Sequence, residues 1–246
     1  MKLFKNIFLL FWRLWFYGWM IGTIVFVLPV LVIVISKDKW YPIFFKIAKA
    51  WAKTILFVMG FRAVEIGKQK LEKNKSYLFC PNHTSMVDIM LMLAITKNPF
   101  VFLGKKELET IPIFGYVYKR TCILVDRGSI KSRRIAFLEA QKRLKKGLSV
   151  CIFPEGQVPD NENIILEKFH SGAFRLAIEH QIPVVPISFF DCKKLFSYTF
   201  FSGGPGKLRF KIHAPIITTN LIMKDRNALK EQTHKIIHTS LVNDLK

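Results

Sequence analysis

Acidic residues are scarce in this sequence of 246 residues, which has 17 Asp and Glu against 38 Lys and Arg. The formal charge of +21 indicates an anionic partner: nucleic acid, an acidic membrane surface or a phosphorylated substrate. The sequence contains no zinc finger and no aromatic-rich nucleic-acid module, so we expect no nucleic-acid partner. The hydrophobic fraction of 51%, with 23 Phe, instead favours membrane lipid.

Cysteine is scarce too, and its distribution argues against a metal site. No two of the four cysteines are close enough in sequence to form a local pair of metal ligands, and each sits in or beside an apolar run. We expect buried, reduced thiols, no metal, and a cytosolic domain. These residues are Cys80, Cys122, Cys151 and Cys192. The Gly-x-Ser-x-Gly nucleophile elbow is absent as well, which argues against a serine hydrolase.

Charge is missing from Leu14 to Ser36, a run of 23 residues. As a helix this run would be roughly 34 Å long, at ~1.5 Å per residue, which is enough for the core of a bilayer. The alternative is a signal peptide whose charged region holds Lys2 and Lys5, but no small-x-small cleavage site precedes Lys37. We therefore expect a membrane-embedded apolar helix.

The next segment, Trp40 to Gly60, predicts an amphipathic helix lying in the membrane surface. Three lysines share one side, and the other side is apolar: Phe44, Ile47, Trp51, Ile55 and Val58. The alternative is a core helix of the domain that follows. Basic residues on both sides of the apolar run, Arg13 among them, leave open a helical hairpin in one leaflet or a single span. Residues 1–60 are thus predicted to anchor the chain in a membrane, expected to be a bacterial cytoplasmic membrane, with the domain that follows facing the cytosol.

From residue 61 to 246, short apolar runs alternate with helical stretches. Expected strands are Tyr77–Cys80, Cys122–Val125, Val150–Phe153, Val184–Phe190 and Leu208–Ile212, and expected helices are Asp88–Thr96, Ser132–Lys146 and Gly172–His180. This alternation predicts an α/β domain, with a mostly parallel central sheet flanked by helices. Polar motifs follow several of the strands, and ligand sites gather at the carboxyl ends of strands in such sheets.

The first of these motifs is "FCPNHTSMVDIM", Phe79 to Met90, where His83 precedes Asp88 by five residues. Histidine is a natural general base because its ordinary pKa is about 6.5, and an aspartate can fix its tautomer. Five residues advance a helix by about 500°, so the two side chains cannot share a helical face. His83 must lie before the helix and Asp88 inside it, with Thr84 and Ser85 as candidate N-caps. A histidine and an aspartate at this spacing also occur in ordinary surface loops.

Four further blocks follow in order: "FLGKKEL" (Phe102–Leu108), "ILVDR" (Ile123–Arg127), "IFPEG" (Ile152–Gly156) and "QIPVVPISF" (Gln181–Phe189). Together with the His-Asp motif, they resemble the HxxxxD glycerolipid acyltransferase family, specifically the 1-acyl-sn-glycerol-3-phosphate (lysophosphatidic acid) acyltransferases. The resemblance extends roughly from Gly60 to Phe190, and a membrane segment ahead of it is typical of the family.

The resemblance implies that His83 is the base for the sn-2 hydroxyl of lysophosphatidic acid, and that Asp88 orients it. The acyl donor would be acyl-CoA or acyl carrier protein, as a substrate rather than a bound cofactor, and the product phosphatidic acid. Arg127, supported by Lys105, would hold the acceptor phosphate, because a guanidinium makes two parallel bonds to phosphate. Glu155 and Gly156 would contribute to acceptor binding. Oxyanion donors would be backbone N–H groups near the start of the Asp88 helix.

The sequence departs from the family pattern at two places. Gln157-Val158-Pro159 replaces a frequent Thr-Arg-Ser, and Thr121-Cys122 replaces a frequent glycine. The missing arginine places more of the phosphate-binding charge on Arg127, Lys105 or Lys168. Two alternatives stay open: the same chemistry on glycerol 3-phosphate or a lyso-aminolipid, and a non-catalytic membrane adaptor. An adaptor would not need His83, Asp88 and Glu155 together.

Overall fold

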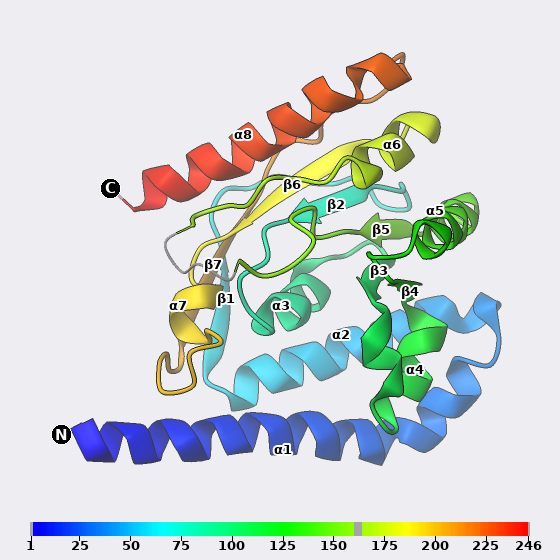
Figure 1. Cartoon of the computed structure of the whole chain (residues 1–246). Coiled ribbons are helices and arrows are strands. Elements are labelled where there is room, and N and C mark those ends of the chain that lie inside the picture. Colours follow the sequence, from blue (N-terminus) through cyan, green and yellow to red (C-terminus); the bar gives the residue numbers. More distant parts are fainter. Residues whose placement is uncertain (1, 160–163, 246) are drawn as a thin grey trace. The chain divides into compact units, whose positions relative to one another are not determined.

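The computed structural model describes residues 2–159 and 164–245. Its strands form a seven-stranded sheet in the order β1-β7-β6-β2-β5-β3-β4, and the registered pairs are parallel (Figure 1). The strands are β1 (Phe61–Glu65), β2 (Leu78–Pro81), β3 (Phe100–Lys105), β4 (Ile123–Val125), β5 (Ser149–Cys151), β6 (Val184–Phe189) and β7 (Gly206–Ile212). The predicted α/β class with a mostly parallel sheet is confirmed.

The helices agree with the sequence-based prediction at the five predicted positions and add three more. They are α1 (Lys2–Val34), α2 (Tyr41–Val58), α3 (Val87–Ile95), α4 (Phe114–Thr121), α5 (Ile130–Lys145), α6 (Gly172–Glu179), α7 (Cys192–Leu195) and α8 (Arg226–Asp244). Short 3-10 turns are η1 (Asp38–Trp40), η2 (Lys106–Thr110) and η3 (Met223–Asp225).

The chain divides into two compact units. Unit 1 comprises Met1–Glu65, Thr84–Thr96 and Phe189–Phe210, and unit 2 comprises Ile66–His83, Lys97–Ser188 and Lys211–Lys246. Unit 1 thus includes α3 and the segment around α7 as well as the N-terminal helices, and the domain boundary after residue 60 stays a prediction. The membrane-anchoring role of residues 1–60 stays a prediction.

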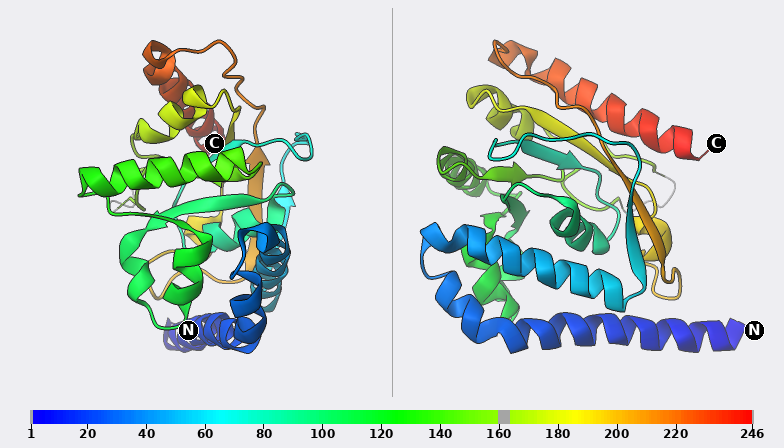
Figure 2. Two further views of the ribbon diagram at one scale, coloured as in Figure 1. Left: turned by 90° about the vertical axis from the view of Figure 1, so that its right-hand side faces the viewer. Right: turned by 180° about the vertical axis from the view of Figure 1, so that it is seen from behind.

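In unit 1, α2 returns antiparallel alongside α1, as Figures 1 and 2 show from three sides. The Trp51 indole N–H donates to Thr23 Oγ1 at 2.9 Å and ties the two helices together. On its other side α2 packs against α3, where Lys49 Nζ donates to the Thr96 carbonyl at 2.5 Å. One of the three predicted surface lysines is thus bonded within unit 1, while Lys46 and Lys53 are exposed, and the interfacial role of α2 stays a prediction.

Helix α1 begins twelve residues earlier than the charge-free run suggested. Within it, Leu3–Val34 is one helix long and apolar enough to cross a membrane, among the residues that the structure describes. Its buried face in the first half is Leu9, Trp12, Arg13 and Phe16. These positions follow helical spacing, so a charged residue occupies the buried stripe.

Unit 2 contains the strands β6, β2, β5, β3 and β4. Strands β2, β5 and β6 are buried along their whole length, as expected for strands covered on both faces of a parallel sheet. Helix α5 packs against β4 and β5, and α6 packs against α8 (Figure 1). The four cysteines are free thiols, three of them buried.

Candidate functional site

The loop between β2 and α3 holds the His-Asp motif. Strand β2 ends at Pro81 and α3 begins at Val87, so His83 lies outside the helix and Asp88 is its second residue. This is the arrangement that the five-residue spacing requires. The boundary between the two units falls at the peptide bond between His83 and Thr84.

On the unit 1 side, the Asp88 carboxylate is completely buried, at 0% exposure. Its Oδ2 accepts the backbone N–H of Thr84 at 2.6 Å and that of Ser85 at 2.8 Å. A buried carboxylate requires such donors. The Asp88 side chain therefore closes the turn ahead of its own helix. Of the two predicted N-caps, Ser85 accepts the Val87 N–H through Oγ at 3.2 Å.

The charge of Asp88 affects two side chains of the segment after β6. Burial, and then the charge of Asp88, hold the pKa of the Cys192 thiol well above its ordinary value. Burial and the same carboxylate also raise the pKa of the Tyr198 phenol. Both groups are therefore neutral near pH 7, and neither is a candidate nucleophile.

The predicted oxyanion donors at the start of α3 already have acceptors. The N–H groups of Thr84 and Ser85 bond to Asp88, and that of Val87 bonds to Ser85 Oγ. The N–H of Asp88 bonds to the Ser85 carbonyl at 3.2 Å, and that of Ile89 to the Met86 carbonyl at 3.3 Å. In this conformation these five amides support the turn instead of facing a substrate.

On the unit 2 side, His83 is held by its backbone and by its ring. Its N–H donates to Glu155 Oε1 at 2.7 Å. Its imidazole stacks on the Phe153 ring, with centroids 4.1 Å apart and planes inclined by 25°. Phe153 stacks in turn on Phe102, with centroids 6.2 Å apart. This stack of three rings fixes the orientation of the His83 imidazole, the candidate base.

Glu155, predicted to bind substrate, contacts two backbone N–H groups. It is 3% exposed, and its second oxygen accepts the Glu167 N–H at 3.0 Å. The carboxylate therefore joins the His83 loop to the segment ahead of α6. Sequence reasoning placed Glu155 in the site but missed this partner 12 residues away.

Gly156 occupies a position that only glycine suits. Its φ is +86°, and a Cβ there would lie 2.8 Å and 2.9 Å from His170 Cδ2 and Nε2. The same point is 3.8 Å from Arg127 Nη1. The structure thus brings together Gly156, Arg127 and His170. Sequence reasoning missed His170, because the sequence shows it only as a polar residue just before the Gly172 helix.

Arg127 and Lys105 follow neighbouring strands. Lys105, the last residue of β3, pairs in register with Val125 of β4, two residues before Arg127. The Lys105 side chain is exposed. The backbone carbonyl of Lys105 accepts a hydrogen bond from the Tyr118 hydroxyl at 3.2 Å. Burial lowers the pKa of Arg127, while the charge of Glu107 opposes that change. The Arg127 guanidinium lies beside Gly156.

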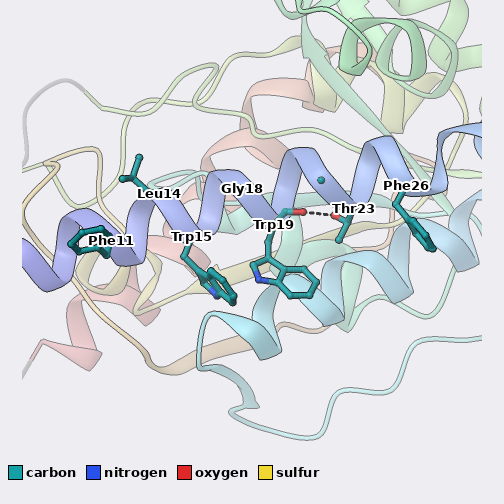
Figure 3. A pocket seen from close by; sticks show the side chains of 8 residues that line it. Phe11, Leu14, Trp15, Gly18, Trp19, Thr23 and Phe26 are labelled. Carbon is teal, nitrogen blue, oxygen red and sulfur yellow. Dashed lines mark hydrogen bonds between the residues drawn. The ribbon is translucent and has the colours of Figure 1, made fainter.

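A groove on α1 lies apart in sequence from the predicted site residues. An apolar groove of about 700 Å³ on α1 is lined by that helix alone, including Trp15, Gly18, Trp19 and Phe26, and contains no predicted site residue (Figure 3). Among residues 2–159 and 164–245, no group of three or more His, Cys, Asp or Glu could hold a metal ion.

Comparison with known proteins decides the family. A family model described as Acyltransferase matches residues 63–190, more than half of the chain. The chain belongs to the acyltransferase family. An uncharacterized acyltransferase of Schizosaccharomyces pombe is 26% identical over 213 residues, covering 85% of this chain and 76% of that protein. The 1-acyl-sn-glycerol-3-phosphate acyltransferase of Borreliella burgdorferi is 25% identical over 202 residues, covering 82% and 78%.

A solved structure agrees with this acyltransferase along nearly its whole length. It is the 1-acyl-sn-glycerophosphate (LPA) acyltransferase PlsC of Thermotoga maritima, with a TM-score of 0.79 and 21% identity, covering 99% of this chain and 97% of that one. At this identity the likeness establishes the fold alone. The predicted family, the O-acyltransferase class and the α/β fold are confirmed.

Proposed function

We propose that this acyltransferase transfers a fatty acyl group to the sn-2 hydroxyl of lysophosphatidic acid, giving phosphatidic acid. The proposed donor is the thioester of acyl-CoA or of acyl carrier protein. The names of the B. burgdorferi and T. maritima relatives specify this type of acceptor. The observation that carries the proposal is the neighbourhood of His83, since Glu155 holds its backbone and the next residue, Gly156, lies near Arg127.

The proposed chemistry is a direct transfer. An imidazole nitrogen of His83 takes the proton of the acceptor hydroxyl, and the oxygen attacks the thioester carbonyl. The tetrahedral intermediate then expels the thiolate, which takes the proton from the imidazolium. The products are the new ester and the free thiol, and His83 returns to its neutral form. A positioned base of this kind is worth about 10²–10⁴-fold in rate.

Asp88 and Glu155 have supporting roles in this proposal. Asp88 orients the His83 loop and stabilises the imidazolium while the proton is held. The Oδ2 bonds to Thr84 and Ser85 support the first part of that role. Glu155 holds the backbone of His83, and Phe153 sets the ring plane. Neither Glu155 nor Phe153 needs to touch the acceptor.

Arg127 is the proposed ligand of the acceptor phosphate, with Lys105 in support. Replacing Arg127 by Ala should raise the KM for lysophosphatidic acid by about tenfold or more, because a charge-assisted bond to phosphate is lost. The KM for the acyl donor should change little. Arg134→Ala, which removes an exposed arginine from α5, is the matched control. Equal increases in both KM values would argue against phosphate contact at Arg127.

The proposed location is a membrane, with the catalytic residues on its cytosolic side. The helix Leu3–Val34 and the membrane setting expected of a lipid substrate support the membrane location. The product lipid would then be released into the leaflet from which the acceptor came.

The test is acyl transfer from acyl-CoA and acyl carrier protein to lysophosphatidic acid, glycerol 3-phosphate and a lyso-aminolipid. We expect lysophosphatidic acid to be the preferred acceptor, and His83→Ala to abolish its use. His238→Ala is a matched control, since His238 on α8 stacks on His234 and contacts no proposed site residue. If the enzyme prefers another acceptor, that acceptor replaces lysophosphatidic acid as the proposed substrate. Full activity of His83→Ala would refute the proposed base.

A further inference from the structure

Arg13 is the only charged residue between Lys5 and Lys37, yet it belongs to the buried stripe of α1. Its side chain is 2% exposed. A buried cation is costly unless acceptors surround it. An arginine buried at this position therefore indicates a specific set of partners. It does more than mark one end of a membrane helix.

Besides Tyr17 on the next turn of α1, the partners of Arg13 come from one distant segment. Its Nη2 donates to the carbonyls of Ser197, Thr199 and Ser202, at 2.8, 2.9 and 3.1 Å. The guanidinium also lies over two aromatic rings, 4.7 Å from the centre of Phe196 and 5.2 Å from that of Phe200. Three carbonyls of one loop thus converge on a single nitrogen, and the cation fixes the course of residues 196–202.

The same segment supports the loop of the His-Asp motif. The Phe196 carbonyl accepts the Ser85 hydroxyl at 2.5 Å. The backbone N–H of Ser85 donates to Asp88 Oδ2 at 2.8 Å. The Phe196 ring packs on Trp12 and Phe16 of α1, with centroids 5.5 Å and 4.5 Å away. Every one of these residues belongs to unit 1.

We propose that Arg13 is a positioning residue for acyl transfer, acting through Phe196 and Ser85 on the turn that Asp88 closes. The apolar helix then does more than hold the enzyme at a membrane, because one of its side chains sets the geometry of the catalytic loop. This inference rests on the proposed function, which gives the Asp88 motif its catalytic role.

A double-mutant cycle on the full-length enzyme tests the link. Arg13→Met and Ser85→Ala should each lower kcat by about tenfold, while both KM values stay within about twofold. If the two residues act through one chain of contacts, the double variant should lose about tenfold as well, because coupled residues are non-additive. Arg13→Lys should recover part of kcat, since a lysine keeps the charge but not the flat, multiply bonded geometry.

Lys5→Met is the matched control, since it removes an exposed charge from the same helix. Its effect should be within about twofold, and it should add independently to that of Ser85→Ala. A loss of about a hundredfold in the Arg13→Met/Ser85→Ala double variant, the product of the single effects, would overturn the proposal.

Hydrogen exchange at Thr84 and Ser85 gives a readout that does not depend on the substrate. Arg13→Met should speed exchange of these amides by about tenfold, because opening of the turn becomes easier, whereas Lys5→Met should not. Unchanged exchange in Arg13→Met would overturn the proposal even if the enzyme acts on lysophosphatidic acid. Faster exchange would support it even if another acceptor is preferred.

A milder variant covers the case in which Arg13→Met does not fold. Phe200→Leu removes one ring beside the guanidinium and leaves its three carbonyl bonds in place. It should lower kcat by about twofold to threefold and speed exchange at Ser85 in the same direction. No change in either measurement would count against the proposal.

Discussion

Two buried carboxylates accept the backbone N–H groups of His83, Thr84 and Ser85. They differ in their separation along the sequence from the residues that they bind. Asp88 binds the amides of Thr84 and Ser85 from within the same loop, four and three residues away. Glu155 binds the amide of His83 from 72 residues away. Three consecutive N–H groups are thus held by two carboxylates, one local and one brought in by the sheet. The Asp88 contacts can be expected from the sequence spacing, whereas the Glu155 contact forms only when the chain folds.

The largest effect in this comparison is expected from Glu155→Gln. An amide side chain offers one neutral acceptor where two charged oxygens now bind His83 and Glu167, so the His83 backbone should loosen. We expect kcat to fall about 10–10²-fold with little change in the KM for the acceptor. Steady-state kinetics with lysophosphatidic acid separates the two parameters.

The opposite outcome would support the acceptor-binding role first predicted for Glu155. A large rise in acceptor KM with kcat unchanged would mean that the carboxylate binds substrate in solution. Glu231→Gln, the same change at an exposed position of α8, serves as the matched control and should leave both parameters within about twofold.

The next effect concerns the glycine that follows Glu155. Gly156→Ala should lower the midpoint of thermal unfolding, because φ is +86° and the new Cβ would meet the His170 ring. Gly147→Ala is the control with a similar φ of +76° and no atom within 4 Å of the new Cβ. The control should cost about 1–2 kcal/mol from backbone strain alone, and Gly156→Ala should cost more. Differential scanning calorimetry compares them.

Adding His170→Ala to Gly156→Ala should recover the difference between the two glycine variants, since the clashing ring is removed. If Gly156→Ala is no less stable than Gly147→Ala, the close approach of His170 to Gly156 does not exist in solution.

A last effect concerns pH and is expected at His213. Burial lowers its pKa to about 4, and Lys211 adds to the shift. In the unfolded chain a histidine binds its proton near pH 6.5, so between about pH 6.5 and 4 the unfolded state binds more protons. The free energy of unfolding should therefore fall as the pH is lowered through this range.

His213→Gln should flatten that pH dependence while keeping a partner for Ser188 Oγ, which lies 2.9 Å from His213 Nε2. Urea unfolding at a series of pH values from 7 to 4 gives the slope. An equal slope in the variant and the wild-type protein would show that His213 does not titrate in the way described.

Sequence reasoning succeeded where a feature is local or forms a continuous apolar run. The strands β2, β5 and β6 were predicted because they are buried along their length. The edge strand β1 was missed because Phe61 is its only buried residue. Helix α8 was missed because its buried residues form a narrow stripe of Leu229, Thr233, Ile237 and Leu241, one of them polar.

The same limit applies to the candidate site. His83 and Asp88 could be placed from their spacing, and Arg127, Glu155 and Gly156 from the family resemblance. The bond from His83 to Glu155 and the contact of His170 with Gly156 depend on tertiary structure, which no local pattern encodes. Arg13 is the clearest example, since the sequence presents it as a charge at the end of an apolar run, whereas its three carbonyl partners lie more than 180 residues away.

The most direct test of the account is the release of thiol from acyl-CoA, followed in time with and without lysophosphatidic acid. Direct transfer with His83 as the base predicts no burst of thiol without acceptor, steady release once lysophosphatidic acid is added, and none above background in His83→Ala. A burst of one thiol per enzyme without acceptor, or full release by His83→Ala, would contradict it.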